Sequence, residues 1–380
     1  MDGELRADLA AAGVEVLVRP LAVLRRAALS PAGLLGIGGA LARDAGGVAR
    51  LCRAREVALV HTNTSVTLGG SAAARIARVP HVWHVREIYA GFERCWPAYR
   101  RLLLSADALP CVSQATRAQL GATAKAHVLH DGLALAPERA ARGGARAALD
   151  LPGEAFVVAI LGRISSWKGQ DVLIRALAAG GGRGCDAGGD GSAGGRGRGG
   201  DGSASGGHGD PETIAFIAGD PWQGEERRLE ELRALARSLG VEARVRFAGF
   251  RPDVENVYGA ADVVAVPSTQ PDPLPNAALE AAAAGCCVVA ADHGGLPEII
   301  DDGVTGRLVA PGDPQALARA LAELRDDPAA RARLGAAAAA DVRERFSAAQ
   351  LLARTQDLYD RLCEPRRGRP EPVSPGRARS

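Results

Sequence analysis

Residues 156–170 read FVVAILGRISSWKGQ, and this stretch decides the fold. Six apolar residues without alternation are typical of a strand covered on both faces, as in a parallel sheet. A glycine and Arg163 follow the strand, and Lys168 stands five positions later beside a second glycine. Ligands of open α/β sheets bind at the carboxyl ends of the strands. We therefore expect Arg163 and Lys168 at a binding edge rather than as two unrelated surface cations.

A second segment, PDPLPNAALE at residues 271–280, predicts a partner for the first. It follows a predicted strand and enters an apolar helix, for which Asn276 is the expected N-cap. The free N–H groups of a helix start suit phosphate. Asp272 before the helix and Glu280 inside it offer carboxylates to vicinal hydroxyls. The helix is otherwise apolar, so we favour a ligand for Glu280 over a surface position. Together the two segments predict a site for a nucleotide-sugar.

Composition limits the other functions. A chain of 380 residues is too long for one ordinary core, and two domains are expected. A net charge of +2 argues against nucleic-acid binding. Seven cysteines without a CxxC pair suit a reducing cytosol and give no metal spacing. No run of 18 apolar residues exists, and the polar start is no secretion signal, so we expect a cytoplasmic protein with at most peripheral membrane contact.

Short apolar runs alternate with helical patterns, which predicts doubly wound α/β domains. The clearest helix covers 225–239 and stops at Gly240. The predicted strands are 14–18, 57–60, 81–85, 108–112, 126–129, 156–161, 214–218, 245–247, 262–266, 287–290 and 307–309.

The domain boundary is expected within 136–152, which gives domains of 1–150 and 151–345 and a last helix over 346–363. Residues 180–210 are mostly glycine and cannot bury enough apolar area to order, so we predict a disordered loop. The tail 364–380 is predicted to be disordered as well.

Two glycines at 294 and 295 begin a turn that ends in Glu298. They either let the backbone approach a ligand or only make a tight turn, and the residues favour neither. For Glu298 we expect helix capping rather than the orientation of a site cation.

These motifs resemble the retaining family-4 glycosyltransferases of GT-B fold. The resemblance is carried by Gly162-Arg163, Lys168-Gly169, Pro267-Ser268, Asp272, Glu280-Ala281, Gly285, Val288-Val289, Gly294-Gly295 and Pro297-Glu298. It implies two Rossmann-like domains, the first on the acceptor side and the second binding the donor, with the last helix crossing back to the first.

The resemblance also implies roles for the donor-site residues. Arg163 and Lys168 neutralise the diphosphate, Gly162 beside them belongs to the donor-binding loop, and Glu280 holds the ribose hydroxyls. Asp272 stands where the family usually has Glu and contacts the donor sugar. The implied remaining contacts are the backbone after it at Leu274, Asn276 and Ala277, and a base pocket at Phe250 and Arg251.

In the first half, HVWHVRE at residues 81–87 resembles the segment that faces the donor sugar. His84 and Arg86 are both candidates for the residue nearest the anomeric carbon, and a structural role is also open for His84. A loop with His61, Asn63 and Thr64 is a candidate for acceptor contact. Two further positions are noted at the end of strands: Asp131-Gly132 as a turn and Ser113 as a helix cap.

The family opens with a strand, a glycine-rich loop and a helix. Here Leu5–Leu9 already predicts a helix, and the glycines at 36, 38 and 39 follow no strand. We therefore expect the first strand-helix-strand of the fold to be missing.

The predicted reaction is glycosyl transfer from a nucleoside-diphosphate sugar to a glycan or lipid-linked acceptor with retention, for surface polysaccharide or glycolipid synthesis. Charge stabilisation of the leaving diphosphate would supply most of the catalysis, without metal or other cofactor. The alternatives are a non-catalytic or truncated sugar-nucleotide-binding remnant, and an epimerase or hydrolase of the same fold.

Overall fold

The computed structural model describes residues 4–24, 31–89, 94–134, 136–180 and 212–364. Within them the chain divides into two compact units. Unit 1 takes residues up to 111, 120–127 and those from 355 onward, and unit 2 takes 112–119 and 128–354. The glycine-rich insert and the tail lie, except for Gly180 and Glu364, outside the described residues.

Unit 2 is built on a six-stranded parallel sheet in the order β10-β9-β8-β5-β6-β7. Its strands are β5 (Phe156–Leu161), β6 (Thr213–Ala218), β7 (Val245–Gly249), β8 (Val263–Val266), β9 (Cys287–Ala291) and β10 (Arg307–Val309). All of these were predicted within two residues. The chain runs outward from β5 in one direction and from β8 in the other. The topological switch point, where such sheets bind ligands, is therefore between β5 and β8.

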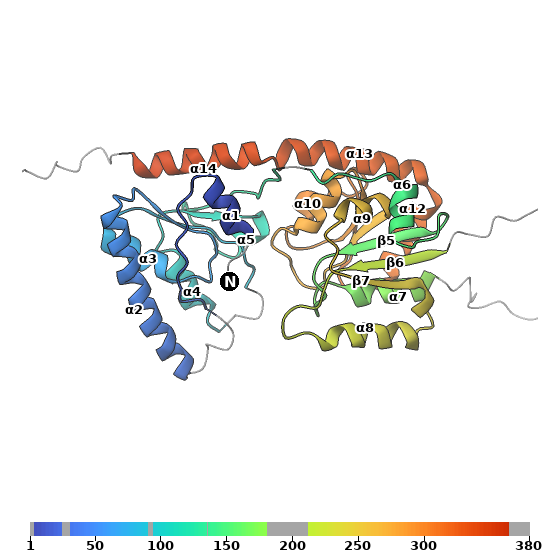
Figure 1. Ribbon diagram of the computed structural model, residues 1–380, viewed down its shortest axis with the longest axis horizontal. Helices are drawn as coiled ribbons and strands as arrows, with labels where there is room; N and C mark the ends of the chain where they lie inside the picture. The colour runs from blue at the N-terminus through green and yellow to red at the C-terminus, as the bar shows by residue number, and fades with distance from the viewer. Residues whose placement is uncertain (1–3, 25–30, 90–93, 135, 181–211, 365–380) are drawn as a thin grey trace, which may run out of the picture. The chain divides into compact units, whose positions relative to one another are not determined.

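Helices cover both faces of this sheet (Figure 1). One core includes side chains of α7 (Gln170–Gly180), α8 (Arg227–Ser238) and α12 (Pro314–Asp326). The other includes side chains of α6 (Arg142–Ala148), α9 (Val254–Ala260), α10 (Asn276–Ala283), α11 (Leu296–Ile299) and α13 (Pro328–Arg345). Successive residues of β5 alternate between the two cores, as the pleat of a strand requires. The short helices α5 (Gln114–Ala118) and η2 (Glu242–Arg244) complete the unit.

Unit 1 has shorter strands around the buried Trp83. The strands are β1 (Val60–Thr62), β2 (His81–Trp83), β3 (Leu109–Cys111) and β4 (Ala126–Val128), and β1 pairs with β2 in parallel. The helices are α1 (Glu4–Ala11), α2 (Pro31–Ala54), α3 (Gly69–Ala77) and α4 (Trp96–Leu103). The helix α14 (Ala348–Cys363) joins unit 1 from Thr355, and its Leu358 packs against Val82 and Ala108.

The strand predicted at 14–18 is wrong. This segment is not in a strand, and Val14, Leu17 and Val18 are 49%, 48% and 65% exposed. Apolar residues form a strand only when a neighbour supplies hydrogen bonds and cover, and no described strand pairs with this one. The helix expected at Leu5–Leu9 is confirmed as part of α1.

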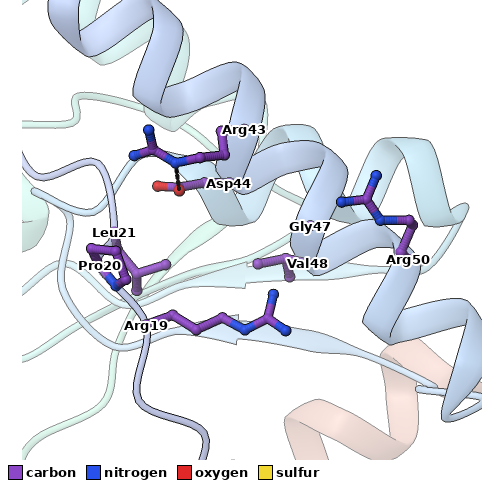
Figure 2. Close-up of a pocket in the computed structure, with 8 residues that line it drawn as sticks. All are labelled: Arg19, Pro20, Leu21, Arg43, Asp44, Gly47, Val48 and Arg50. Atoms are coloured by element: carbon purple, nitrogen blue, oxygen red, sulfur yellow. Dashed lines mark ion pairs between the residues drawn. The ribbon is translucent and has the colours of Figure 1, made fainter.

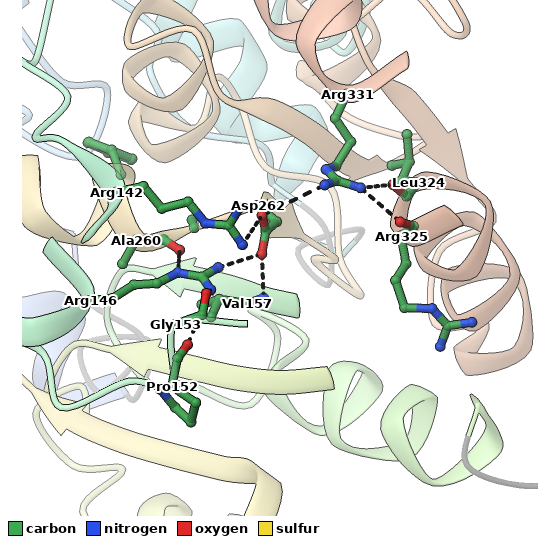
Figure 3. Close-up of polar contacts among 12 residues, drawn as sticks. Arg142, Arg146, Pro152, Gly153, Val157, Ala260, Asp262, Leu324, Arg325 and Arg331 are labelled. Atoms are coloured by element: carbon green, nitrogen blue, oxygen red, sulfur yellow. Dashed lines mark hydrogen bonds and ion pairs between the residues drawn. The ribbon is translucent and has the colours of Figure 1, made fainter. Parts of the chain in front are cut away.

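An arginine cluster attaches residues 139–153 to the sheet of unit 2 (Figure 3). Arg146 on α6 is buried, and its guanidinium lies 2.7 Å from the Asp262 carboxylate, where Asp262 leads into β8. Arg146 also donates to Ala260 O, and Arg139 donates to the carbonyls of Tyr258 and Ala261. Cations are favourable at these carbonyls because they end α9. These contacts attach the segment to unit 2, whose last stretch begins at residue 128, ahead of the boundary that we expected within 136–152.

Arg146 and Arg142 offer a matched test, since both leave α6 toward Asp262. Arg146→Met leaves a buried carboxylate without its main partner, and we expect a loss of about 3–5 kcal/mol in the free energy of unfolding. The Arg142 side chain is 54% exposed, so Arg142→Met is expected to cost less than about 1 kcal/mol. Urea denaturation of both variants measures this. Equal losses in the two variants would show that the buried Arg146–Asp262 pair stabilises the fold no more than the exposed Arg142–Asp262 pair does.

Candidate functional site

Two loops meet at the switch point, one after β5 and the other after β8. Gly169 in the first has φ +78°, and a Cβ atom there would lie 1.9 Å from Pro267 O in the second. Thr269 N also donates a hydrogen bond of 2.8 Å to Trp167 O. The loops are thus in backbone contact, and only glycine fits at this point.

Lys168 and Asp272, predicted from separate motifs, form an ion pair across these loops. Lys168 Nζ lies 2.6 Å from Asp272 Oδ2, and Asp272 is 6% exposed. A Cβ atom at Gly294 would lie 2.4 Å from Asp272 O, and one at Gly295 would lie 2.0 Å from Pro273 O. These glycines therefore allow the backbone at residues 294 and 295 to pack closely against the loop that contains Asp272, rather than against a ligand.

Arg163 lies exposed directly after Gly162, whose φ is +134°. Its guanidinium carbon is 3.3 Å from the centroid of the Trp222 ring. Partial burial lowers the pKa of Arg163. Among the described residues no carboxylate forms an ion pair with it. Arg163 therefore keeps its positive charge at the carboxyl end of β5.

The helix α10 starts shortly after Asp272 in the chain, and the predicted N-cap of this helix is wrong. Asn276 is the first helical residue rather than the N-cap, and Pro275 takes the cap position without a side-chain hydrogen bond. The Pro275 carbonyl accepts the first helical bonds, from the N–H groups of Ala278 and Leu279. Leu274 is buried, so its backbone alone can meet a ligand. Asn276 is exposed and Ala277 is half-buried.

Glu280 lies half-buried one turn inside α10. Its Oε2 atom accepts a 3.1 Å hydrogen bond from the hydroxyl of Tyr258, which is fully buried. Burial raises the pKa of Glu280, although the Tyr258 hydrogen bond acts against this shift. The carboxylate therefore has a protein partner on one oxygen.

Phe250 and Arg251 follow β7 at the same edge of the sheet. Phe250 is 71% exposed, and its N–H donates to Asp220. Arg251 is 2.7 Å from Asp253, which neutralises it. An exposed ring without a covering side chain suits stacking against a planar ligand.

Glu298 caps a helix, as expected, although the helix is a distant one in sequence. Its carboxylate accepts from the N–H groups of Gln114 (2.8 Å) and Ala115 (3.1 Å), and it is 2.9 Å from His130 Nε2. Burial alone would raise the pKa of Glu298, but these hydrogen bonds outweigh it and lower the pKa. Ser113 caps the same helix, α5, by accepting from Thr116 N.

Unit 1 brings together His61 in β1 and His84 directly after β2, with ring centroids 5.6 Å apart. His84 is buried, and the His61 ring contacts the Tyr359 hydroxyl. Burial and the charge of Arg86 lower the pKa of His61.

Two of the remaining candidates, Thr64 and the Asp131-Gly132 turn, make contacts within the fold. Thr64 donates to Glu87, which also accepts from Ser65 N at 3.1 Å, so Glu87 fixes the loop after β1. In unit 2, the turn at Asp131-Gly132 packs on Ser347, because a Cβ atom at Gly132 would lie 2.6 Å from Ser347 O. Asn63 is exposed at the loop after β1.

A separate cavity on unit 1 contains none of the predicted residues (Figure 2). It lies between the segment at Arg19–Leu21 and the face of α2 with Arg43 and Arg50. The buried Asp44 accepts a hydrogen bond from Ala22 N, and so attaches this segment to α2.

Sequence reasoning missed Trp222, Trp167 and Tyr258. Trp167 stands next to Lys168, so its place in the sequence was a usable signal. Trp222 reaches the site from the segment after β6 and Tyr258 from α9, both distant in sequence. Three buried polar atoms were also missed, and none of them has a hydrogen-bond partner among the described residues. They are Ser165 Oγ in the loop after β5, Gln170 Oε1 at the start of α7 and Ser268 Oγ in the loop after β8.

Among the residues that the structure describes, no group of three or more His, Cys, Asp or Glu is placed to hold a metal ion. None of the described helices is long and apolar enough to cross a bilayer.

Comparison with known families gives two matches. The model "Glycosyltransferase Family 4" matches residues 4–136, and the model "Glycosyl transferases group 1" matches residues 208–341. A D-inositol 3-phosphate glycosyltransferase of Corynebacterium kroppenstedtii is 37% identical over 217 residues, which are 57% of this chain and 42% of that protein. The chain thus spans less than half the length of the curated relatives it matches.

Solved structures share the whole fold. The crystal structure of Anabaena HepE in complex with UDP aligns with a TM-score of 0.74 at 26% identity, covering 95% of this chain and 90% of that one. HepE in complex with UDP-glucose aligns with a TM-score of 0.73 at 27% identity, covering 95% and 90%.

The raised pKa of Glu280 predicts a dependence of stability on pH. An acid with a raised folded-state pKa stabilises the fold below its ordinary value, here 4.5, and loses that stabilisation as the pH rises through the raised value. Glu280→Gln cannot ionise. We expect the melting temperature of the wild type to fall relative to this variant as the pH rises from about 4 to about 7. Glu230→Gln at an exposed position is the control. A constant difference in melting temperature between wild type and Glu280→Gln across this pH range would contradict the raised pKa of Glu280.

Proposed function

The chain belongs to the glycosyltransferases of GT-B fold, and we propose that it transfers a sugar from a nucleoside-diphosphate sugar to a hydroxyl of a polar acceptor, with retention of anomeric configuration. The observation that carries this proposal is the charge at the switch point. Lys168 is paired with Asp272, which stands just before α10, and Arg163 is paired with no described carboxylate. This net positive charge suits a diphosphate.

UDP is the nucleotide that we propose first, because HepE, with the same fold over nearly the whole chain, was solved with UDP and with UDP-glucose. In this arrangement Glu280 binds the ribose hydroxyls with the carboxylate oxygen that Tyr258 does not use. The exposed ring of Phe250 stacks on the base. Asp272 contacts the donor sugar while it holds Lys168.

The bond between the anomeric carbon and the diphosphate oxygen breaks, and a bond from the same carbon to the acceptor oxygen forms on the same face. The acceptor proton passes to the leaving phosphate oxygen. Arg163, Lys168 and the first N–H groups of α10 stabilise the charge that develops on the diphosphate, and such fixed donors account for large rate effects. Because these groups supply the positive charge, we propose that no divalent metal takes part.

For the acceptor we propose a phosphorylated cyclitol, since the curated relatives are named D-inositol 3-phosphate glycosyltransferases. Arg86, which follows β2 beside His61 and His84, supplies the positive charge in unit 1 that suits a phosphorylated acceptor. A glycan or lipid-linked acceptor, as in cell-surface polymer synthesis, is the second candidate.

Donor binding is tested by thermal shift and calorimetry of the wild type with UDP and a panel of nucleotide-sugars. A true ligand at a hundredfold excess over its Kd stabilises the fold by about 2.7 kcal/mol. Lys168→Met removes a charge-assisted hydrogen bond, so we expect its Kd for UDP to rise by about tenfold or more. Lys168→Met/Asp272→Asn avoids an unpaired buried carboxylate and should bind as weakly. Arg227→Met, at an exposed residue of α8, is the control and should bind like the wild type. Unchanged binding in both Lys168 variants would exclude this site.

Turnover separates the transferase from its alternatives. With UDP-glucose and an inositol phosphate, NMR is expected to show a new glycoside with the α configuration of the donor, and EDTA should leave the rate unchanged. Donor binding without any product would favour a non-catalytic binding protein. Free sugar or an epimerised donor, without acceptor, would favour the hydrolase or epimerase.

A further inference from the structure

Both cations of the donor site lie over indole rings. The guanidinium carbon of Arg163 is 3.3 Å from the centroid of Trp222, and Lys168 Nζ is 4.3 Å from the centroid of Trp167. The chain has four tryptophans, and the other two, Trp83 and Trp96, lie in unit 1. Both tryptophans of unit 2 are thus at the same edge, each against a site cation.

Backbone hydrogen bonds hold Trp222 beside the loop that carries Arg163. Trp222 N donates a 2.8 Å hydrogen bond to Ile164 O, and Ile164 N donates at 2.8 Å to Asp220 O. The segment after β6 is thereby attached to the loop that follows β5. Stacking occupies one face of the guanidinium and leaves the N–H groups at its edge available to a ligand.

The backbone of Trp167 is attached in a similar manner. Its carbonyl accepts the 2.8 Å hydrogen bond from Thr269 N, so it is attached to the loop after β8. Lysine has a flexible side chain, and here the ring and the Asp272 carboxylate together restrict the position of its ammonium group.

An indole orients a cation in a way that a carboxylate cannot. A carboxylate partner would also hold Arg163, but it would cancel the charge that a diphosphate needs. The face of an aromatic ring attracts the cation through its quadrupole and leaves the net charge intact.

We propose that Trp222 and Trp167 are positioning residues of the donor site, which hold Arg163 and Lys168 in place for the diphosphate without neutralising them. This inference rests on the proposed function. Trp222 has the larger role, because Arg163 has no described carboxylate partner, whereas Asp272 still holds Lys168 when Trp167 is replaced.

The test compares Trp222→Leu with Trp222→Phe by calorimetry with UDP and by NMR titration with uridine, which lacks phosphates. Trp222→Leu removes the ring and is expected to raise the Kd for UDP about tenfold. Trp222→Phe keeps a weaker ring and should recover part of that loss. The Kd for uridine should change less than twofold in both variants, because only the phosphate contacts depend on Arg163.

The outcomes separate the inference from the function. A wild type that does not bind UDP overturns the proposed function and this inference with it. If the wild type binds UDP and Trp222→Leu binds it equally well, or loses uridine as strongly as UDP, the positioning role is wrong while the function stands.

A spectroscopic measurement gives an independent readout. UDP is expected to change the tryptophan fluorescence of the wild type, because two of its four indoles touch the site cations. The change should disappear in Trp167→Phe/Trp222→Phe, which retains only Trp83 and Trp96. Persistence of the full change in this double variant would contradict the inference.

Discussion

The contact between two loops at the switch point of one parallel sheet determines the arrangement of the site. The loop after β5 and the loop after β8 approach so closely that Gly169 has no room for a side chain against Pro267. This contact brings Lys168 within ion-pair distance of Asp272, just before the start of α10, while Arg163 stands in the first loop directly after β5. Gly294 and Gly295 support the second loop from a third strand end. The doubly wound topology thus assembles a charged site from segments about a hundred residues apart.

Arginine has two different roles at the two ends of the strands of this sheet. Before β8, Arg146 is buried and its donors are taken by Asp262 and by carbonyls, so it contributes to stability. After β5, Arg163 is exposed and stacked on Trp222, with no described carboxylate beside it. Partner and burial, rather than residue type, distinguish a structural arginine from one that is available to a ligand.

Much of unit 2 could be predicted from the sequence, and the reasons are physical. The strands β5 and β10 have the predicted bounds, because continuous apolar runs flanked by glycine or charge leave few alternatives. The strand predicted at 14–18 failed because a strand depends on its neighbour, which residue patterns alone do not supply. The predicted cap at Asn276 failed by one position, since the carbonyl of Pro275 already accepts the first helical bonds. The Tyr258–Glu280 and Trp222–Arg163 contacts could not be predicted, because the first depends on how α9 and α10 pack and the second on how two loops pack.

The central claim is that a nucleoside diphosphate binds across the loops after β5 and β8. Hydrogen–deuterium exchange of the full chain with and without UDP, read by mass spectrometry of its peptides, tests this claim most directly. The account predicts slower exchange on UDP addition in peptides covering 162–170 and 267–280, where backbone N–H groups face the diphosphate. UDP binding without protection in these two loops, or with protection confined to unit 1, would contradict it.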